Sequence, residues 1–244
     1  MNPFSLESDQ YARFRPTYPT ELINLIVSLA PQKFIAWDVA CGNGQLTLEL
    51  SNHFETVIAT DVSKEQIAKA PQKANIDYRV EPSENTSIDT TSVDLITVSQ
   101  AIHWFNFDQF YNQVRKVIKP NGILALIAYI LPTITPEIDA VIQEFYNGTL
   151  NGYWDERRKF IEEEYTTIPF PFEEVKLPSY YIEQQWKRED LIGYLSTWSA
   201  VKKYKQKTST DPIAIVADKI NSIWGENEIV EVKTPLITKI ARIK

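Results

Sequence analysis

The chain is poor in the residues that build covalent or metal-bound frameworks. Cys41 is the only cysteine among 244 residues. A single cysteine excludes an internal disulfide and any metal cluster held by cysteines, so we expect no metal site. Long apolar runs are also missing, because none approaches the ~20 residues that a helix needs to cross a bilayer. The first residues show neither a basic start nor an apolar stretch, so we expect no secretion signal, no membrane partner and a cytoplasmic location.

Positive charge is the minority sign. The 25 lysines and arginines face 32 aspartates and glutamates, which gives a net charge of −7, and the two signs are interspersed. This acidic balance argues against a protein that binds nucleic acid through its phosphate backbone. The one basic cluster, KKYKQK at residues 202–207, is interpreted as a solvated helix end rather than as a nucleic-acid contact. We therefore expect no nucleic-acid partner, while the oligomeric state has no signature in the sequence.

Glycine is missing from one position where a dinucleotide site requires it. The apolar run 34–37 ends in Asp38, and Gly42 and Gly44 follow before a helical pattern resumes. Glycines at such a strand-to-helix corner permit positive φ and let a ligand approach the backbone. The third position of the G-x-G-x-x-G pattern holds Thr47, which argues against a bound pyrophosphate. No G-K-[ST] follows either, so the corner is not a P-loop.

A second acid closes the next strand. The run 56–60 leads into Asp61, so carboxylates follow two neighbouring parallel strands. One carboxylate, Asp38, can face a cation, and the other, Asp61, can accept both hydroxyls of a ribose. A ligand that has a ribose, a charged amino-acid tail and no phosphate fits this pair, and S-adenosylmethionine is such a ligand. The alternative is that both acids are strand-end caps without a ligand.

Short apolar segments alternate with helical patterns through the first half of the chain. The expected strands are residues 34–37, 56–62, 76–80, 93–98 and 123–130. This alternation predicts a right-handed, mostly parallel α/β sheet. We expect a Rossmann-like, seven-stranded sheet with helices on both faces and a C-terminal helical lid. Residues 1–131 would form the cofactor-binding core with an N-terminal arm, 132–228 the lid with one strand, and 229–244 a final strand that completes the sheet.

Local signals refine these elements. Thr20 is expected to cap a helix that reaches about Ala30, and Ser63 to cap the helix after the second strand. The KPNG segment at 119–122 is expected to separate a helix from the last parallel strand. A strand is expected within 175–186, and the last residues are expected to form a strand or a hairpin. Further helices are expected at residues 136–150, 154–164, 189–203 and 212–224.

Four motifs together resemble those of a known family. They are DVACGNGQ at 38–45, DVS at 61–63, SQAIHWF at 99–105 and KPNGIL at 119–124. In this order they resemble the motifs of class I S-adenosylmethionine-dependent methyltransferases. The arm YARFRPTYP at 11–19 and the segment YLSTWS at 194–199 resemble the trans-aconitate methyltransferase-like branch of small-molecule enzymes. Ala40 and Gln45 stand where glycine is usual, and similar departures occur within that branch.

The resemblance implies a set of cofactor-binding residues. Asp38 to Gly44 would wrap the methionine part, Asp61 would bind the ribose and Val62 would pack on the adenine. Ser83 and Glu84 would lie near the adenine edge, and Gln100 would approach the methionine moiety. Tyr11 and Arg15 would close over the cofactor, with Arg15 a candidate partner for a carboxylate. The implied set is Tyr11, Arg15, Asp38, Ala40, Gly42, Gly44, Gln45, Asp61, Val62, Ser83, Glu84 and Gln100.

Methyl transfer to a small-molecule acceptor is the function that this resemblance implies. An in-line displacement at a sulfonium-activated carbon requires alignment and exclusion of water, and a base is optional. A carboxylate acceptor needs no base, whereas a hydroxyl or an amine would favour His103 as the catalytic base. The alternative for His103 and Trp104 is that they only shape the pocket wall.

Two other functions stay open at this point. One is a regulatory module that binds S-adenosylmethionine and transfers nothing. The other is a nucleic-acid or protein methyltransferase, which the acidic balance disfavours. That alternative also lacks its Asn/Asp-Pro-Pro-[Tyr/Phe] segment, since SQAI stands at residues 99–102.

Overall fold

A computed structural model describes residues 14, 16–225 and 229–244, and the chain divides into two compact units. The sheet unit comprises residues 17–130, 160–180 and 236–244. The helical unit comprises 131–159 and 181–235, together with the described residues before 17. Residues 160–180, which the sequence analysis assigned to the lid, therefore cluster with the sheet.

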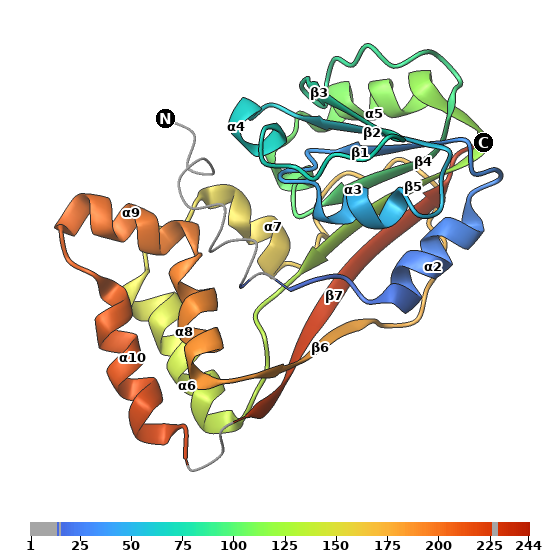
Figure 1. Cartoon of the computed structure of the whole chain (residues 1–244). Coiled ribbons are helices and arrows are strands. Elements are labelled where there is room, and N and C mark those ends of the chain that lie inside the picture. Colours follow the sequence, from blue (N-terminus) through green and yellow to red (C-terminus); the bar gives the residue numbers. More distant parts are fainter. Residues whose placement is uncertain (1–13, 15, 226–228) are drawn as a thin grey trace. The chain divides into compact units, whose positions relative to one another are not determined.

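The strands form one seven-stranded sheet with the order β3-β2-β1-β4-β5-β7-β6 (Figure 1). Strands β1 to β5 run parallel to their neighbours, and β7 is antiparallel to both β5 and β6. This is the mostly parallel Rossmann-like sheet that the sequence predicts. The strands are β1 (Ile35–Val39), β2 (Thr56–Asp61), β3 (Ile76–Val80), β4 (Val93–Ser99), β5 (Ile118–Tyr129), β6 (Tyr181–Trp186) and β7 (Val230–Arg242).

Helices cover both faces of the parallel strands, as the sequence predicts. Consecutive strand residues point to opposite faces, so Leu95 joins the core under α2 and α3 while Ile96 joins the core under α5. The helices contribute apolar stripes such as Leu22 and Ile26 on α2, and Phe110 on α5. The helices of this unit are α2 (Thr20–Leu29), α3 (Gln45–Leu50), α4 (Lys64–Ile67) and α5 (Phe107–Val117), with most of α7 (Lys159–Glu162).

A buried carboxylate connects the N-terminal ends of β1, β4 and β5. The Asp94 side chain is fully buried and accepts hydrogen bonds from the backbone N–H groups of Phe34 and Ile35, at 3.1 and 3.0 Å. Its other oxygen forms an ion pair with Lys119 Nζ at 2.9 Å. The pairing of β4 with β5 shifts register at this point. The helix before the KPNG segment ends at Val117, as predicted to within one residue, but β5 already begins at Ile118 and includes residues 119–122, which the sequence analysis places before the strand.

The helical unit is built around an aromatic core. Its helices are α6 (Pro136–Glu144), the π-helix η2 (Phe145–Thr149), η3 (Glu156–Arg158), α8 (Arg188–Ser196), α9 (Ser199–Thr208) and α10 (Pro212–Ile223). Trp198 packs against Phe145, Tyr146 and Trp154, with ring centroids 5.4 to 6.0 Å apart. The predicted single helix over 189–203 is wrong. The Thr197 hydroxyl donates a hydrogen bond to the Tyr194 carbonyl at the end of α8, and the backbone is extended at Trp198, before α9 begins.

Other local predictions had mixed outcomes. Ser63 caps α4, as predicted, by accepting a hydrogen bond from the Gln66 N–H. Thr20 is not the cap of α2, because Pro19 occupies the N-cap position and no side chain caps the helix. The last residues form the one long strand β7 rather than a hairpin. Within the described part of the chain, no helix has the length and apolar character that a membrane span requires.

Candidate functional site

The corner between β1 and α3 has three residues in the left-handed region. The φ angles are +52° at Ala40, +57° at Gly42 and +82° at Gly44. Glycine adopts this region freely, whereas the left-handed conformation costs other residues roughly 1–2 kcal/mol. Gly44 has a second constraint, because a Cβ there would clash with the Tyr78 hydroxyl on β3. Gly44 thus serves a turn and a close contact, while Ala40 holds a glycine-type conformation at a cost.

Asp38 supports this corner from inside the protein. Its side chain is buried, with 1% exposure. Thr47 on α3 donates a hydrogen bond to Oδ2 at 2.6 Å, and Thr97 on β4 donates one to Oδ1 at 2.8 Å. Burial raises the pKa of Asp38 to about 6, with a smaller raising effect from the Asp61 charge, while the two hydroxyls act in the opposite direction. Asp38 therefore ties β1 to α3 and β4, rather than presenting an open carboxylate to a ligand.

Asp61 presents a different environment at the end of β2. Oδ2 accepts the Gly42 N–H at 2.9 Å and Oδ1 accepts the Ser63 N–H at 2.8 Å. These bonds fix the carboxylate between the glycine corner and the start of α4. Each carboxylate oxygen has two lone pairs, so each keeps one for a further donor. Val62, beside it, is 68% exposed, which leaves a flat apolar surface next to a rigid acceptor.

The loop after β3 binds to the start of α5. Ser83 is buried, and its hydroxyl donates to Glu84 Oε2 at 2.9 Å. Glu84 Oε1 accepts the N–H of Asn106, whose own side chain caps α5. The two residues expected near an adenine edge are thus engaged with each other and with α5.

The end of β4 combines an unusual backbone with a buried histidine. Gln100 has a φ of +54°, and its Nε2 donates to the Tyr129 carbonyl at 3.3 Å. The neighbouring Ser99 Oγ is buried and makes no hydrogen bond within the described residues. His103, on η1 (Ile102–Trp104), is 5% exposed, and its Nδ1 lies 2.9 Å from the Tyr165 hydroxyl.

Several of these contacts had no part in the predicted site. The sequence does contain a signal for the contacts of Thr47 and Thr97, because each is a hydroxyl residue within an apolar segment, where a buried hydroxyl needs a hydrogen-bond partner. Tyr165 carries none, because it lies in an irregular segment far along the chain. Gln45 begins α3, so it lies next to the corner. Tyr11 and Arg15 lie outside the described residues.

Cys41, within the corner, and Tyr78, beside Gly44, both have a raised pKa that favours the protonated form. Burial first, and then the charges of Asp38 and Asp61, raise the pKa of the Cys41 thiol. Burial likewise raises the pKa of Tyr78 to about 12. A protonated thiol is a poor nucleophile, so this corner is suited to binding rather than to covalent chemistry.

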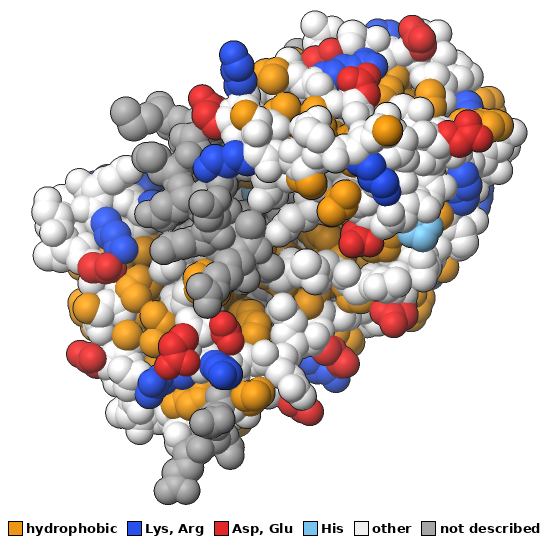
Figure 2. Space-filling model, viewed as in Figure 1, with side chains coloured by type: hydrophobic (Ala, Val, Ile, Leu, Met, Phe, Trp, Pro, Cys, Tyr) orange, Lys and Arg blue, Asp and Glu red, His pale blue; other side chains and the backbone are white. Residues whose placement is uncertain are grey.

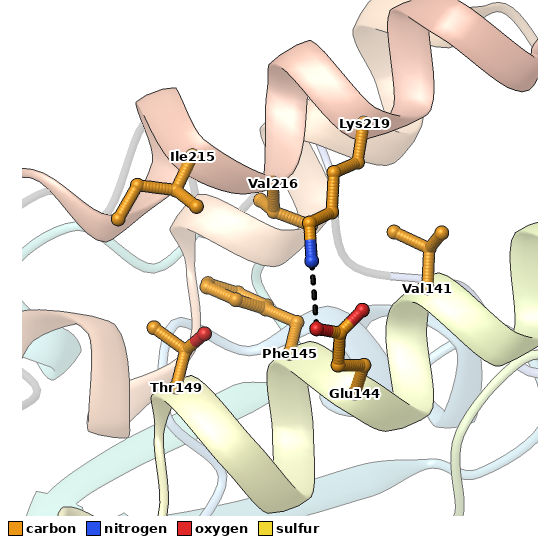
Figure 3. Close-up of a pocket in the computed structure, with 7 residues that line it drawn as sticks. All are labelled: Val141, Glu144, Phe145, Thr149, Ile215, Val216 and Lys219. Carbon is orange, nitrogen blue, oxygen red and sulfur yellow. Dashed lines mark hydrogen bonds and ion pairs between the residues drawn. The ribbon is translucent and has the colours of Figure 1, made fainter.

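A hollow elsewhere in the protein has a different character. Figure 3 shows it between α6 and α10 of the helical unit, where Glu144 and Lys219 form an ion pair at 2.7 Å. The remaining lining side chains are Val141, Phe145, Thr149, Ile215 and Val216. None of these residues belongs to a strand end, so this hollow is separate from the acids described above.

Comparison with known proteins identifies the family. A methyltransferase domain matches residues 37–126. A Dictyostelium discoideum protein described as a methyltransferase is 32% identical over 241 residues, which cover 96% of this chain and 92% of that protein. The chain belongs to the class I S-adenosylmethionine-dependent methyltransferases.

Solved structures agree with this assignment. The methyltransferase is 37% identical to a protein of Anaeromyxobacter dehalogenans described as a type II methyltransferase, with a TM-score of 0.87 over 94% of this chain and 98% of the other. A Saccharomyces cerevisiae protein named as S-adenosylmethionine-dependent is 31% identical over 159 residues, which cover 61% of this chain and 54% of that protein. The matched domain of the methyltransferase includes the glycine corner, Asp61 and Gln100.

Proposed function

We propose that this methyltransferase binds S-adenosylmethionine at the ends of β1, β2 and β4 and transfers the methyl group to a small-molecule acceptor. The observation that carries the proposal is the Asp61 carboxylate, held by the Gly42 and Ser63 N–H groups with acceptor capacity left on both oxygens. A ribose offers two adjacent hydroxyls, which this arrangement suits. Exposed Val62 offers apolar surface for a base beside it.

The other residues of the proposed site have distinct tasks. Gly42, where an added Cβ would meet no described atom within 4 Å, leaves the backbone open to the methionine part. Gly44 keeps the turn and its close contact with Tyr78, and Asp38 holds the corner in shape through Thr47 and Thr97. Ser99, whose buried hydroxyl has no hydrogen-bond partner among the described residues, adds a polar group at the end of β4. The cofactor supplies a methyl group activated by a sulfonium, so the protein's task is to align the acceptor for in-line displacement. Ala40, Gln45, Ser83, Glu84, Gln100, Tyr11 and Arg15 complete the proposed set.

The charge distribution supports a small-molecule acceptor. Within the basic cluster on α9, Lys205 pairs with Asp211 at 2.8 Å and Lys203 lies 3.8 Å from Asp155. Figure 2 shows the acidic and basic side chains of the described residues interspersed over the face drawn, without a continuous basic patch. A surface that grips a phosphate backbone needs such a patch.

A carboxylate is the acceptor group that we propose. Its support is the likeness of residues 11–19 and 194–199 to the trans-aconitate methyltransferase-like branch. In the structure, Tyr194 and Trp198 of the second segment are buried in the core of the helical unit. This segment thus shapes the unit from within, and the acceptor class depends on an assay with carboxylates, alcohols and amines in parallel.

Calorimetry with S-adenosylmethionine and S-adenosylhomocysteine tests the binding site. Replacing Asp61 with Ala removes charged hydrogen bonds, so we expect affinity to fall about 10- to 100-fold. Asp77→Ala is the matched control, because Asp77 lies on the adjacent strand β3 and pairs with Arg79 at 2.6 Å. Equal affinities of the wild type and the Asp61 variant, with circular dichroism confirming both folds, would refute the site. Binding without turnover of any acceptor would instead favour a regulatory module.

A further inference from the structure

Arg158 packs against two aromatic rings in the helical unit. Its guanidinium carbon lies 4.5 Å from the centre of the Trp154 ring and 5.2 Å from the centre of the Tyr146 ring. Its Nε donates a hydrogen bond to the Tyr146 hydroxyl at 2.5 Å. Tyr146 is 6% exposed, whereas Arg158 is half-buried and keeps contact with solvent. The guanidinium is therefore held in one place by two ring contacts and a hydrogen bond.

The two rings are themselves fixed by an irregular helix. Tyr146 lies in the π-helix η2, where the Leu150 N–H donates to the Phe145 carbonyl at 3.0 Å. The Trp154 indole N–H donates to the Tyr146 carbonyl at 3.0 Å, and the two rings are 4.4 Å apart. Trp198 packs against both rings. A π-helical turn is rare and is frequent at functional sites, and here it supports a charged group.

Most of the donors of Arg158 have no acceptor in the protein. A guanidinium has five N–H donors, and only the one on Nε is used by Tyr146. Among the described residues, no carboxylate forms an ion pair with Arg158 and no acceptor binds its two terminal nitrogens. Asp155, three positions earlier, binds the Arg157 N–H at 3.1 Å and Lys203 Nζ at 3.8 Å. The two terminal nitrogens are thus left as a planar pair of donors, which matches both oxygens of a carboxylate.

The surroundings of Arg158 are basic although the protein is acidic. Residues 153–159 lie beside α9, because the Tyr153 and Tyr204 rings are 4.8 Å apart and Lys207 Nζ lies 5.5 Å from the Tyr153 ring. Residues 153–159 and 199–211 together contain seven lysines and arginines and three acids, whereas the whole chain has a net charge of −7. A basic area of this size attracts an anion and is too small to follow a phosphate backbone.

We propose that Arg158 is the anion-binding group of a site in the helical unit that takes a small molecule with a carboxylate. The terminal nitrogens of Arg158 donate two parallel hydrogen bonds to the carboxylate. Tyr146 and Trp154 hold the guanidinium in position for this contact, and the basic neighbours strengthen the attraction. The site itself needs no S-adenosylmethionine, so it goes beyond the proposed function. Its carboxylate belongs either to the methyl acceptor or to a separate ligand.

Fluorine NMR of protein labelled with 5-fluorotryptophan tests the site without turnover. The chain has six tryptophans, and a Trp154→Phe variant identifies the signal of Trp154. At constant ionic strength, we expect succinate to shift this signal in a saturable manner. Succinamide, the neutral molecule of the same shape, should leave it in place. No shift, a shift that grows linearly with succinate, or an equal shift with both molecules overturns the proposal.

Variants of the arginine identify the group that binds. Arg158→Gln removes the charge and the paired donors, so the affinity for succinate should fall about 10- to 100-fold. Arg158→Lys keeps the charge but lacks the planar pair of donors, so its affinity should lie between the two. Wild-type affinity in Arg158→Gln overturns the proposal. If that variant does not fold, wild-type affinity in Arg158→Lys overturns the bidentate contact.

Arg188→Gln is the matched control for the loss of charge. Arg188 lies on α8 of the same unit and forms an ion pair with Glu189 at 2.9 Å. This variant changes the net charge as Arg158→Gln does, and it should bind succinate with wild-type affinity. A loss equal to that in Arg158→Gln would show that only the overall charge matters, which overturns the site. Circular dichroism confirms the fold of each variant.

Turnover assigns the carboxylate to one of the two sources, and this step rests on the proposed function. If the carboxylate belongs to the methyl acceptor, Arg158→Gln should raise KM for a carboxylate acceptor and leave the affinity for S-adenosylmethionine unchanged. An unchanged KM assigns the site to a separate ligand. Failure of the proposed function is distinguishable, because it would appear as absent S-adenosylmethionine binding in the wild type while the fluorine titration still reports the site.

Discussion

Thr47 Oγ1 donates a hydrogen bond to Asp38 Oδ2 across 2.6 Å, from the position where a dinucleotide-binding fingerprint has its third glycine. A glycine there permits close packing of helix and strand. In this protein a side-chain bond joins α3 to β1 instead, and the same carboxylate also binds Thr97 on β4. The Thr47 hydrogen bond therefore replaces the helix–strand contact that the third glycine would make. The absence of that glycine also argues against a bound pyrophosphate.

Removing the Thr47 hydroxyl should destabilise the protein most when Asp38 is ionised. Thr47→Val keeps the shape but leaves one carboxylate oxygen without its donor, which costs about 1.5–3 kcal/mol for a charged acceptor. The loss should be smaller at pH 4.5, where Asp38, with a pKa of about 6, is protonated in the folded state. Urea unfolding at pH 4.5 and pH 8 measures both values. Thr90→Val, at an exposed loop position, should change stability little at either pH.

Asp38 itself should make the protein less stable as the pH rises. The folded-state pKa of about 6 is above the ordinary aspartate value of 3.8, so the folded state binds more protons than the unfolded state between these values. Its stabilising effect is complete below pH 3.8 and is lost as the pH rises through about 6, with a span of up to about 3 kcal/mol. Asp38→Asn should lack this dependence, so its stability relative to the wild type should increase from pH 4 to pH 8. Parallel pH profiles for the two proteins would contradict the buried-carboxylate account.

Ala40→Gly should stabilise the protein. The φ of +52° penalises alanine by roughly 1–2 kcal/mol, and the more flexible unfolded chain of the glycine variant offsets part of the gain. We expect a net gain of about 0.5–1 kcal/mol, seen as a rise of about 1–4 °C in Tm. The control is Ala68→Gly, at an exposed position with a φ of −64°, where the same change should lower Tm. A fall in Tm at both positions would count against strain at Ala40.

Gly44→Ala should be more costly than an ordinary substitution of a left-handed glycine. The new Cβ meets both the unfavourable φ of +82° and the Tyr78 hydroxyl. We expect a loss of about 2–5 kcal/mol from strain and overpacking together. Gly152→Ala isolates the strain, because Gly152 has a φ of +77° and a Cβ added there would meet no described atom within 4 Å. Chemical denaturation of both variants, and of Gly44→Ala with Tyr78→Phe as a partial rescue, gives the separate contributions.

The parallel part of the sheet could be predicted because local and global signals agree. The strands β1, β2 and β4 and the second half of β5 are apolar runs, and a helix follows each of them, whereas β3 alternates apolar and charged residues. The antiparallel strand β7 was harder to define. Pro235 lacks an N–H and breaks the strand pattern, yet it lies where β7 changes its partner from β6 to β5. A sequence pattern cannot show that the proline stands at a change of partner.

The candidate site was predictable to a similar extent. Asp61 and the glycines lie at the strand ends where the sequence places them, because the carboxyl ends of neighbouring parallel strands meet. The burial of Asp38 was not predictable, since it depends on hydroxyls from α3 and β4 that converge only in the folded chain. Tyr165 reaches His103 through two left-handed residues, and neither of them is a glycine that would have marked the turn.

The pairing of β5 with residues 236–242 of β7 can form only after residues 131–235 have been synthesised. Residues Ile123 to Tyr129 are buried, and one edge of this segment pairs with residues 236–242 of β7. On the ribosome, a nascent chain that has completed β5 must therefore expose an apolar edge strand until the whole helical unit has been translated. Exposed edges of this kind template aggregation. Chaperone capture of the growing chain is thus expected to matter most during translation of residues 131–235.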